Sequence, residues 1–180
     1  EGVWIGEGGR RERIEASNVF WAAGVRASSV GGMLGAERDS AGRVKVLPDL
    51  SIAAHPEVFV IGDLAHAKAG DGDGLTPGVA QGAMQMGVHV SRIIDRETRG
   101  QCVTRPAFRY RDKGMMATIG RAKAVAEIGG RKFGGYPAWL LWLFIHLMFL
   151  IGFRNRLLVF VQWMWAYVTF QRGARLITGK

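Results

Sequence analysis

The stretch VFVIGDLA, residues 58–65, decides how the first half of this chain is expected to fold. Residues 58–61 are apolar without alternation, which is typical of a strand covered on both faces in a parallel sheet. Ligands of open α/β sheets bind beyond the carboxyl ends of such strands. Gly62 would clear space there, and Asp63 could either accept hydrogen bonds from sugar or polyol hydroxyls or merely cap the following turn.

The next segment, TPGVAQGAMQ at residues 76–85, predicts a helix that runs to about Arg96, with Thr76 as its N-cap and Pro77 in its first position. The partial positive charge of a helix N-terminus would stabilise negative charge on a reduced ring. Gln81 and Gln85 lie one turn apart and could donate to a ring-shaped acceptor, although two solvated glutamines are the better explanation of this segment taken by itself. The packed face is expected to comprise Ala80, Ala83, Met84, Gly87, Val88 and Ile94.

Upstream of both segments, the run VFWAAG at residues 19–24 predicts a strand that ends in Gly24, where small residues would let a ligand approach the backbone. Downstream, residues 108–110, 117–119 and 125–128 predict the short strands of a meander, because glycines separate the later runs. The chain opens with EGVWIG, which resembles the middle of a strand, so we expect it to be part of a longer protein.

The last 45 residues are dominated by two apolar runs, residues 137–153 and 157–170. Both are shorter than the roughly 20 residues that a spanning helix needs. Trp and Arg suit the headgroup boundary of a bilayer, and the runs carry or border Trp139, Trp142, Arg154, Arg156, Trp163 and Trp165. We expect helices that lie in one leaflet, with a spanning hairpin or burial inside a soluble oligomer as alternatives.

His146, within the first apolar run, could contact a proton path or a quinone, but a hydrogen bond to a neighbouring residue is the simpler expectation.

The net charge of +9 is confined to the second half of the chain. Residues 1–100 carry 11 basic and 13 acidic residues, whereas residues 101–180 carry 13 basic and two acidic ones. Because this positive charge flanks apolar runs, it indicates an anionic membrane surface and not a nucleic acid as the partner. A single cysteine, Cys102, excludes a disulfide framework and a CxxC redox pair within these residues.

Taken together and in order, these segments resemble the C-terminal half of type II NADH:quinone oxidoreductases, in the flavoprotein superfamily with two dinucleotide-binding domains. WAAGVRAS at residues 21–28 resembles that family's return from the NADH domain to the FAD domain, and VFVIGDLA resembles its second FAD motif. AQGAMQ at residues 80–85 is similar to its AQxAxQ quinone pattern. YRDKGMMATIGRAKAV, residues 110–125, and the tail from residue 152 resemble its meander and its bacterial C-terminus.

The resemblance implies an α/β fold: the end of a three-layer, Rossmann-like FAD domain with the NADH-domain return in residues 1–100, a β meander in residues 101–135, and membrane-binding helices in residues 136–180. FAD would be the cofactor, contacted by Gly24, Gly62, Asp63, Ala80 and Gln81. Quinone would contact Gln81 and Gln85. No acid–base catalytic side chain and no metal ligand is implied.

The implied reaction is hydride transfer from NADH to FAD, followed by two-electron reduction of a membrane quinone without proton pumping. The expected setting is the lipid surface at the cytoplasmic face of a bacterial inner membrane, in the respiratory chain, with a homodimer possible. The GxGxxG motifs would lie upstream, so we expect residues 1–180 alone to be inactive. Two alternatives stay open: an FAD-dependent reductase with a soluble protein acceptor, and a non-catalytic membrane-binding module.

Overall fold

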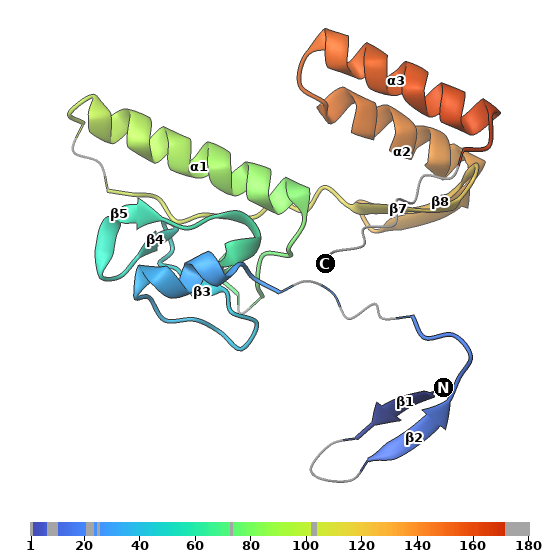
Figure 1. The fold of residues 1–180 in the computed structure, drawn as a ribbon. Helices are drawn as coiled ribbons and strands as arrows, with labels where there is room; N and C mark the ends of the chain where they lie inside the picture. The colour runs from blue at the N-terminus through green and yellow to red at the C-terminus, as the bar shows by residue number, and fades with distance from the viewer. Residues whose placement is uncertain are drawn as a thin grey trace. The chain divides into compact units, whose positions relative to one another are not determined.

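The computed structural model describes residues 2–6, 11–20, 24, 26–72, 74–101 and 104–171. The chain divides into two compact units, Glu1–Tyr110 and Arg111–Lys180 (Figure 1). Both units combine helices with strands, so the α/β class expected from the sequence is confirmed.

The first unit contains short strands, two 3-10 turns and one long helix. In chain order these are β1 (Gly2–Ile5), β2 (Glu12–Glu15), η1 (Ser29–Leu34), β3 (Val44–Lys45), β4 (Ser51–Ile52), β5 (His55–Phe59), η2 (Gly62–Leu64), β6 (Ala65–His66) and α1 (Ala80–Thr98). The pairs β1–β2 and β4–β5 are antiparallel, and β3 pairs with β6 in parallel.

The strand predicted at residues 58–61 is placed differently by the structure. β5 ends at Phe59 and pairs antiparallel with β4, in the register Ser51↔Phe59 and Ile52↔His55. The first three residues of β5 are exposed, and full burial begins at Val60. The expectation of a parallel strand covered on both faces was therefore wrong, because a tight turn returns the chain directly onto β4.

The strand predicted to end in Gly24 falls partly outside the described residues. Trp21, Ala22 and Ala23 lie outside the described residues, as does Cys102.

The core of the first unit gathers around β3, β4, the segment after β5, and one face of α1. Its fully buried members are Val44, Leu50, Ile52, Val60, Ala65, Ala67, Met86, Val90 and Phe108. Leu50 has a φ of 74°, a left-handed conformation that is costly for a branched side chain. Its side chain is only 1% exposed, and its carbonyl accepts the Val60 N–H at 3.0 Å, so core packing holds this turn in place.

The helix α1 begins later and faces the core differently than its sequence indicated. Its N-cap is Val79, which makes no side-chain capping bond, so Thr76 is not the cap. The buried residues of α1 are Gly82, Met86, Val90 and Ile93, whereas Ala80, Met84, Val88 and Ile94 are exposed. The expected face was wrong because apolar and small residues occur on more than one side of this helix, and contact with the core selects among them.

The second unit is a three-stranded meander followed by a helical hairpin. Its elements are β7 (Met115–Gly120), β8 (Lys123–Ile128), β9 (Arg131–Gly135), α2 (Tyr136–Phe149) and α3 (Phe153–Val168). The strands pair antiparallel in the order β7-β8-β9. The meander and two of its predicted strands are confirmed, but residues 108–110 form no strand and β9 takes the third place.

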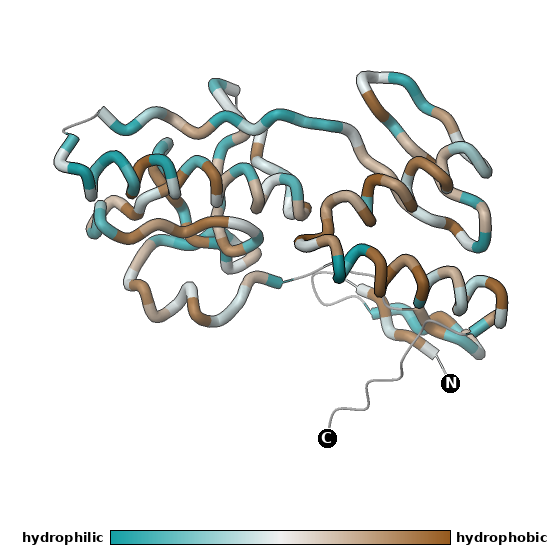
Figure 2. The backbone as a smooth tube through the Cα atoms, turned by 90° about the horizontal axis from the view of Figure 1, so that it is seen from above, coloured by the Kyte–Doolittle hydropathy of each residue, from teal (hydrophilic) through white to brown (hydrophobic). Residues whose placement is uncertain are grey.

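The core of the second unit is built from small side chains. Ala124 and Ala126 of β8 are buried against Ala138 of α2. Most large apolar side chains of α2 and α3 are exposed in consequence, although both helices are among the most hydrophobic stretches of the chain (Figure 2). No helix in the described part of the chain is both long enough and apolar enough to cross a membrane.

Candidate functional site

The Gly62–Asp63 turn packs directly onto α1. Gly62 has a φ of +68°, and a side-chain carbon added to it would lie 3.5 Å from the Cβ of Ala83. Its backbone N–H donates to the Sδ of Met86 at 3.1 Å. The structure therefore brings the turn after β5 against the first half of α1. The motifs VFVIGDLA and AQGAMQ, which are separate in the sequence, thus lie next to each other.

Asp63 is exposed and stands beside the approach to α1. Its Oδ1 would lie 3.5 Å from a side-chain carbon added to Gly78, so the glycine leaves space next to the carboxylate. Among the described residues, no hydrogen bond or ion pair involves this carboxylate. It is therefore available to accept hydrogen bonds.

The start of α1 is held by close backbone packing. A side-chain carbon added to Gly82 would lie 3.0 Å from the Pro77 carbonyl oxygen and 3.1 Å from the Cγ2 of Thr76. Thr76 is itself buried, and its hydroxyl donates to the Lys68 carbonyl at 3.3 Å. Thr76 thus closes the preceding loop instead of capping the helix, which leaves the amide groups of the first turn without a side-chain cap.

Ala80, Gln81 and Gln85 occupy the first two turns of the same helix. Ala80 is exposed and both glutamines are half-buried. Since Gln81 and Gln85 are four residues apart, they lie on one face of the helix. The structure thereby groups five of the six expected cofactor and quinone residues on the turn and on α1.

The sixth residue, Gly24, is not brought to this group. It has a φ of +83°, and a side-chain carbon added there would meet no atom within 4 Å.

The residues expected at a membrane fall into two groups. Trp142 stacks on Trp163 at 5.5 Å between ring centroids, and Trp139 packs on Tyr167 at 5.3 Å, so these tryptophans join α2 to α3. Trp165 is 63% exposed.

The two arginines in the first turn of α3 also differ. Arg154 is exposed, whereas half-buried Arg156 donates from its Nε to the Leu150 carbonyl at 2.8 Å and closes the connection between α2 and α3.

His146 has a local partner within its own helix. Its Nδ1 lies 2.8 Å from the Trp142 carbonyl oxygen, and its ring stacks on Trp142 at 4.2 Å. The simpler expectation for this histidine is confirmed.

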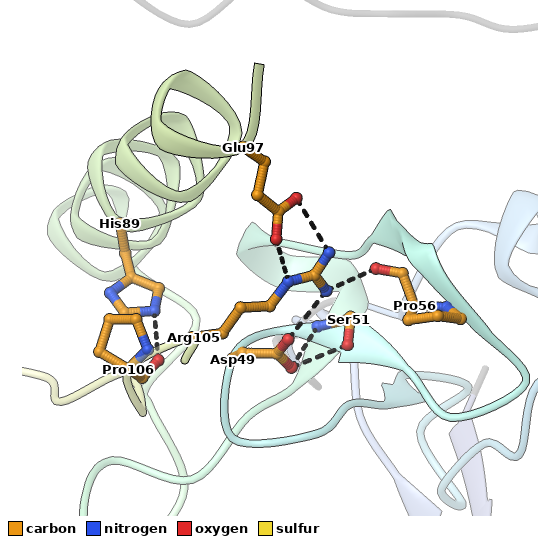
Figure 3. A network of polar contacts seen from close by, with 7 residues as sticks. All are labelled: Asp49, Ser51, Pro56, His89, Glu97, Arg105 and Pro106. Atoms are coloured by element: carbon orange, nitrogen blue, oxygen red, sulfur yellow. Dashed lines mark hydrogen bonds and ion pairs between the residues drawn. The ribbon is translucent and has the colours of Figure 1, made fainter. Parts of the chain in front are cut away.

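Sequence analysis missed a polar cluster centred on Arg105 (Figure 3). The guanidinium makes a two-point contact with Glu97, reaches Asp49 at 3.1 Å and donates to the Pro56 carbonyl at 2.6 Å. It also lies 4.9 Å from the centre of the Phe59 ring. Hydrogen bonds to Glu97 and Asp49 raise the pKa of Arg105, and the cluster ties the end of α1 to β4 and β5.

Asp49 belongs to the same cluster, and its carboxylate accepts hydrogen bonds from Ser51 as well as from Arg105. Burial alone would raise the pKa of Asp49, but hydrogen bonds from Ser51 and Arg105 hold it below its usual value. Asp49 lies far from Glu97 and Arg105 in the sequence. No local pattern could therefore predict that these three residues meet.

A second missed cluster surrounds Asp39. His66 Nδ1 lies 2.8 Å from its Oδ2, and Arg43 donates to the same oxygen from its Nε at 2.7 Å. The hydrogen bond with His66 is the main cause that holds the pKa of Asp39 far below its usual range. This cluster joins the turn before β3 to β6, directly after the Gly62–Asp63 turn.

Two family models match the chain. The pyridine nucleotide-disulphide oxidoreductase model covers residues 3–87, and the model of the NDH2 C-terminal domain covers residues 113–172. The pyridine nucleotide-disulphide oxidoreductase match includes the Gly62–Asp63 turn and the first part of α1, up to residue 87.

Curated relatives narrow this class. The chain is 44% identical over 94% of its length to the type II NADH:quinone oxidoreductase Ndh of Mycobacterium tuberculosis, and 43% identical over 100% of its length to NdhA of the same organism. These alignments cover 36% and 39% of the two relatives, so the chain spans less than half of their length. The chain belongs to the type II NADH:quinone oxidoreductase family, as its motifs indicated.

A solved structure has the same fold. NDH2 of Plasmodium falciparum, in complex with RYL-552, superposes with a TM-score of 0.66 at 14% identity, over 88% of this chain and 46% of that one. At this identity the match supports the α/β flavoprotein fold alone.

Proposed function

We propose that the full-length protein passes a hydride from NADH to FAD and two electrons from the flavin to a membrane quinone, without pumping protons. The observation that carries this proposal is the packing of the Gly62–Asp63 turn onto the half of α1 that bears Gln81 and Gln85. A turn that bears a carboxylate thereby packs against the helix that carries the two amide side chains.

The residues at this place fit a flavin. Asp63 would accept hydrogen bonds from the polyol chain, since its carboxylate is exposed and bonded to no described residue. Gly62 and Gly78 leave the backbone approachable, and the partial positive charge at the N-terminus of α1, near Ala80 and Gln81, would stabilise negative charge on the ring. When bound, FAD supplies the hydride and electron chemistry, and the protein supplies orientation and electrostatics.

Gln81 and Gln85 would hold the quinone. A primary amide donates through two N–H groups, and a quinone presents two carbonyl oxygens as acceptors. Half-burial of both side chains suits a pocket that an apolar ring enters from a lipid phase. We assign Gly24 to the cofactor side only on the family resemblance.

Membrane attachment follows from the second unit. Trp165, Arg154 and the apolar side chains that α2 and α3 leave exposed would lie in the headgroup layer, at the cytoplasmic face of a bacterial inner membrane. The exposed apolar area also suits a homodimer. Flotation of the full-length protein with anionic phospholipid vesicles tests attachment, and failure to float would favour a reductase with a soluble acceptor.

The quinone role has a direct test in the full-length enzyme. Gln81→Ala and Gln85→Ala are expected to slow quinone reduction about tenfold or more while flavin reduction by NADH stays near the wild-type rate. Gln101→Ala is the matched control, because Gln101 lies beyond α1 and is exposed. Equal losses in the two half-reactions would contradict a quinone site at these glutamines.

A further inference from the structure

The contact between Gly62 and Met86 is unusual in its chemistry. A thioether is a weak hydrogen-bond acceptor, yet here it receives a backbone N–H at 3.1 Å. Met86 is 2% exposed, so water does not compete for its sulfur. The amide belongs to the residue directly before Asp63, the carboxylate proposed to hold the flavin polyol.

Three residues of the α1 region meet the turn at successive points. Gly78 borders the Asp63 carboxylate, Ala83 borders Gly62, and Met86 accepts the Gly62 N–H. The Cδ1 of Ile61, on the other side of the turn, would lie 4.0 Å from a side-chain carbon at Gly87. Packing thus limits how closely the turn can approach α1, and the N–H···S bond fixes the position of the turn along the helix.

Gly62 can adopt this position because it has no side chain. Its φ of +68° is open to glycine and strained for other residues. Without the sulfur, a half-buried N–H would lose its acceptor, and the turn would be expected to shift toward water.

We infer that Met86 is a positioning residue for the flavin: through the Gly62 N–H it sets the distance between the Asp63 carboxylate and the first turns of α1. This inference rests on the proposed function, because it concerns the same FAD site. Met86 itself contacts neither FAD nor quinone in this role.

The test compares three variants of the full-length flavoenzyme. Met86→Leu keeps the buried volume and removes the acceptor, a type of change that cores usually tolerate. Met86→Gln restores an acceptor on a side chain of similar length. Met84→Leu is the matched control, because Met84 is 52% exposed on the same helix.

For Met86→Leu we expect amide hydrogen exchange at Gly62 to accelerate about fivefold and the dissociation constant of FAD to rise by a similar factor. Met86→Gln is expected to recover most of both losses, and Met84→Leu to change neither. The KM for quinone should move less than the FAD dissociation constant, since Gln81 and Gln85 keep their place on α1.

Each outcome separates the inference from the proposed function. Faster exchange at Gly62 with unchanged FAD affinity would overturn the positioning role, as would a loss in Met86→Leu that Met86→Gln does not repair. A wild-type protein that retains no FAD would overturn the proposed function instead, and the exchange rate at Gly62 would still report on the Met86 contact.

Discussion

The two units use hydrophobic residues in opposite ways. In the first unit large side chains form the core: Ile52 and Met86 are 1% and 2% exposed. In the second unit alanines are inside, and Phe153 and Ile151 are 79% and 90% exposed. Hydrophobicity along the chain therefore does not tell which residues form a core, because that depends on what each helix packs against.

Charges follow the same division. The Arg105 and Asp39 clusters lie in the first unit, where they connect strands, turns and α1. The guanidinium of Arg121, in the second unit, instead lies against two exposed aromatic rings, 4.6 Å from the centre of Tyr167 and 3.9 Å from that of Phe170. The first unit therefore encloses a core of large side chains, whereas the second leaves most of its large apolar side chains exposed.

The largest expected effect comes from emptying the core of the first unit. Phe108 is 6% exposed, lies edge-on to His89, and its N–H donates to the Pro48 carbonyl. Phe108→Ala should lower the free energy of unfolding by about 3–5 kcal/mol. Urea titrations measure this loss, with the amide hydrogen exchange of α1 as the signal for the first unit. Phe153→Ala in the second unit is the control and should cost little without lipid; equal losses would erase the contrast between the units.

A smaller effect is expected when the exposed apolar surface of the second unit is changed. Trp165→Ser should weaken binding to anionic vesicles about tenfold or more, since a buried large side chain contributes roughly 1.5–3 kcal/mol. Its stability in detergent-free buffer should be nearly unchanged, because Trp165 is already 63% exposed. Co-sedimentation with vesicles measures the binding, and a folding defect without a binding defect would place Trp165 in a core.

The Arg105 cluster should contribute less than the apolar core. Its guanidinium and the Asp49 carboxylate have exposed side-chain fractions of 22% and 15%. Arg105→Ala should therefore cost about 1–3 kcal/mol in urea unfolding, because it removes the cationic partner of Asp49 and leaves that carboxylate only its hydrogen bonds from Ser51. The exposed pair Arg109–Asp71 is the matched control, and Arg109→Ala should cost well below about 1 kcal/mol. Similar costs for both would show that partial burial does not strengthen the cluster.

The smallest expected effect concerns acid. The pKa of Asp39 is held below its unfolded-state value, chiefly by His66, so its stabilising contribution is present above about pH 4 and is lost as the pH falls further. Asp49, also in the first unit, has a lowered pKa and acts in the same direction. The Tm should fall between pH 5 and pH 3, and Asp39→Asn should show a shallower fall. An unchanged slope in Asp39→Asn would assign the acid sensitivity to other groups.

Several features were predictable because they depend on neighbours in sequence. The meander was predictable from short runs that glycines separate, and β8 is followed by a turn in which Gly129 and Gly130 have positive φ. The motif at residues 58–65 indicated a ligand-facing turn, and Gly62 does adopt the positive φ that such a turn requires. What failed was the strand type before it, since pairing with β4 is a contact that a single strand's pattern cannot reveal.

The sequence by itself determined the family, the order of the segments and the concentration of positive charge and apolar runs in the second half, because motifs and composition are local properties. Tertiary structure alone decided which face of α1 is buried, why Thr76 closes a loop instead of capping a helix, and how Met86 reaches Gly62. Those outcomes depend on contacts between residues far apart in the chain, where packing against a shared core selects one arrangement among several that local propensity permits.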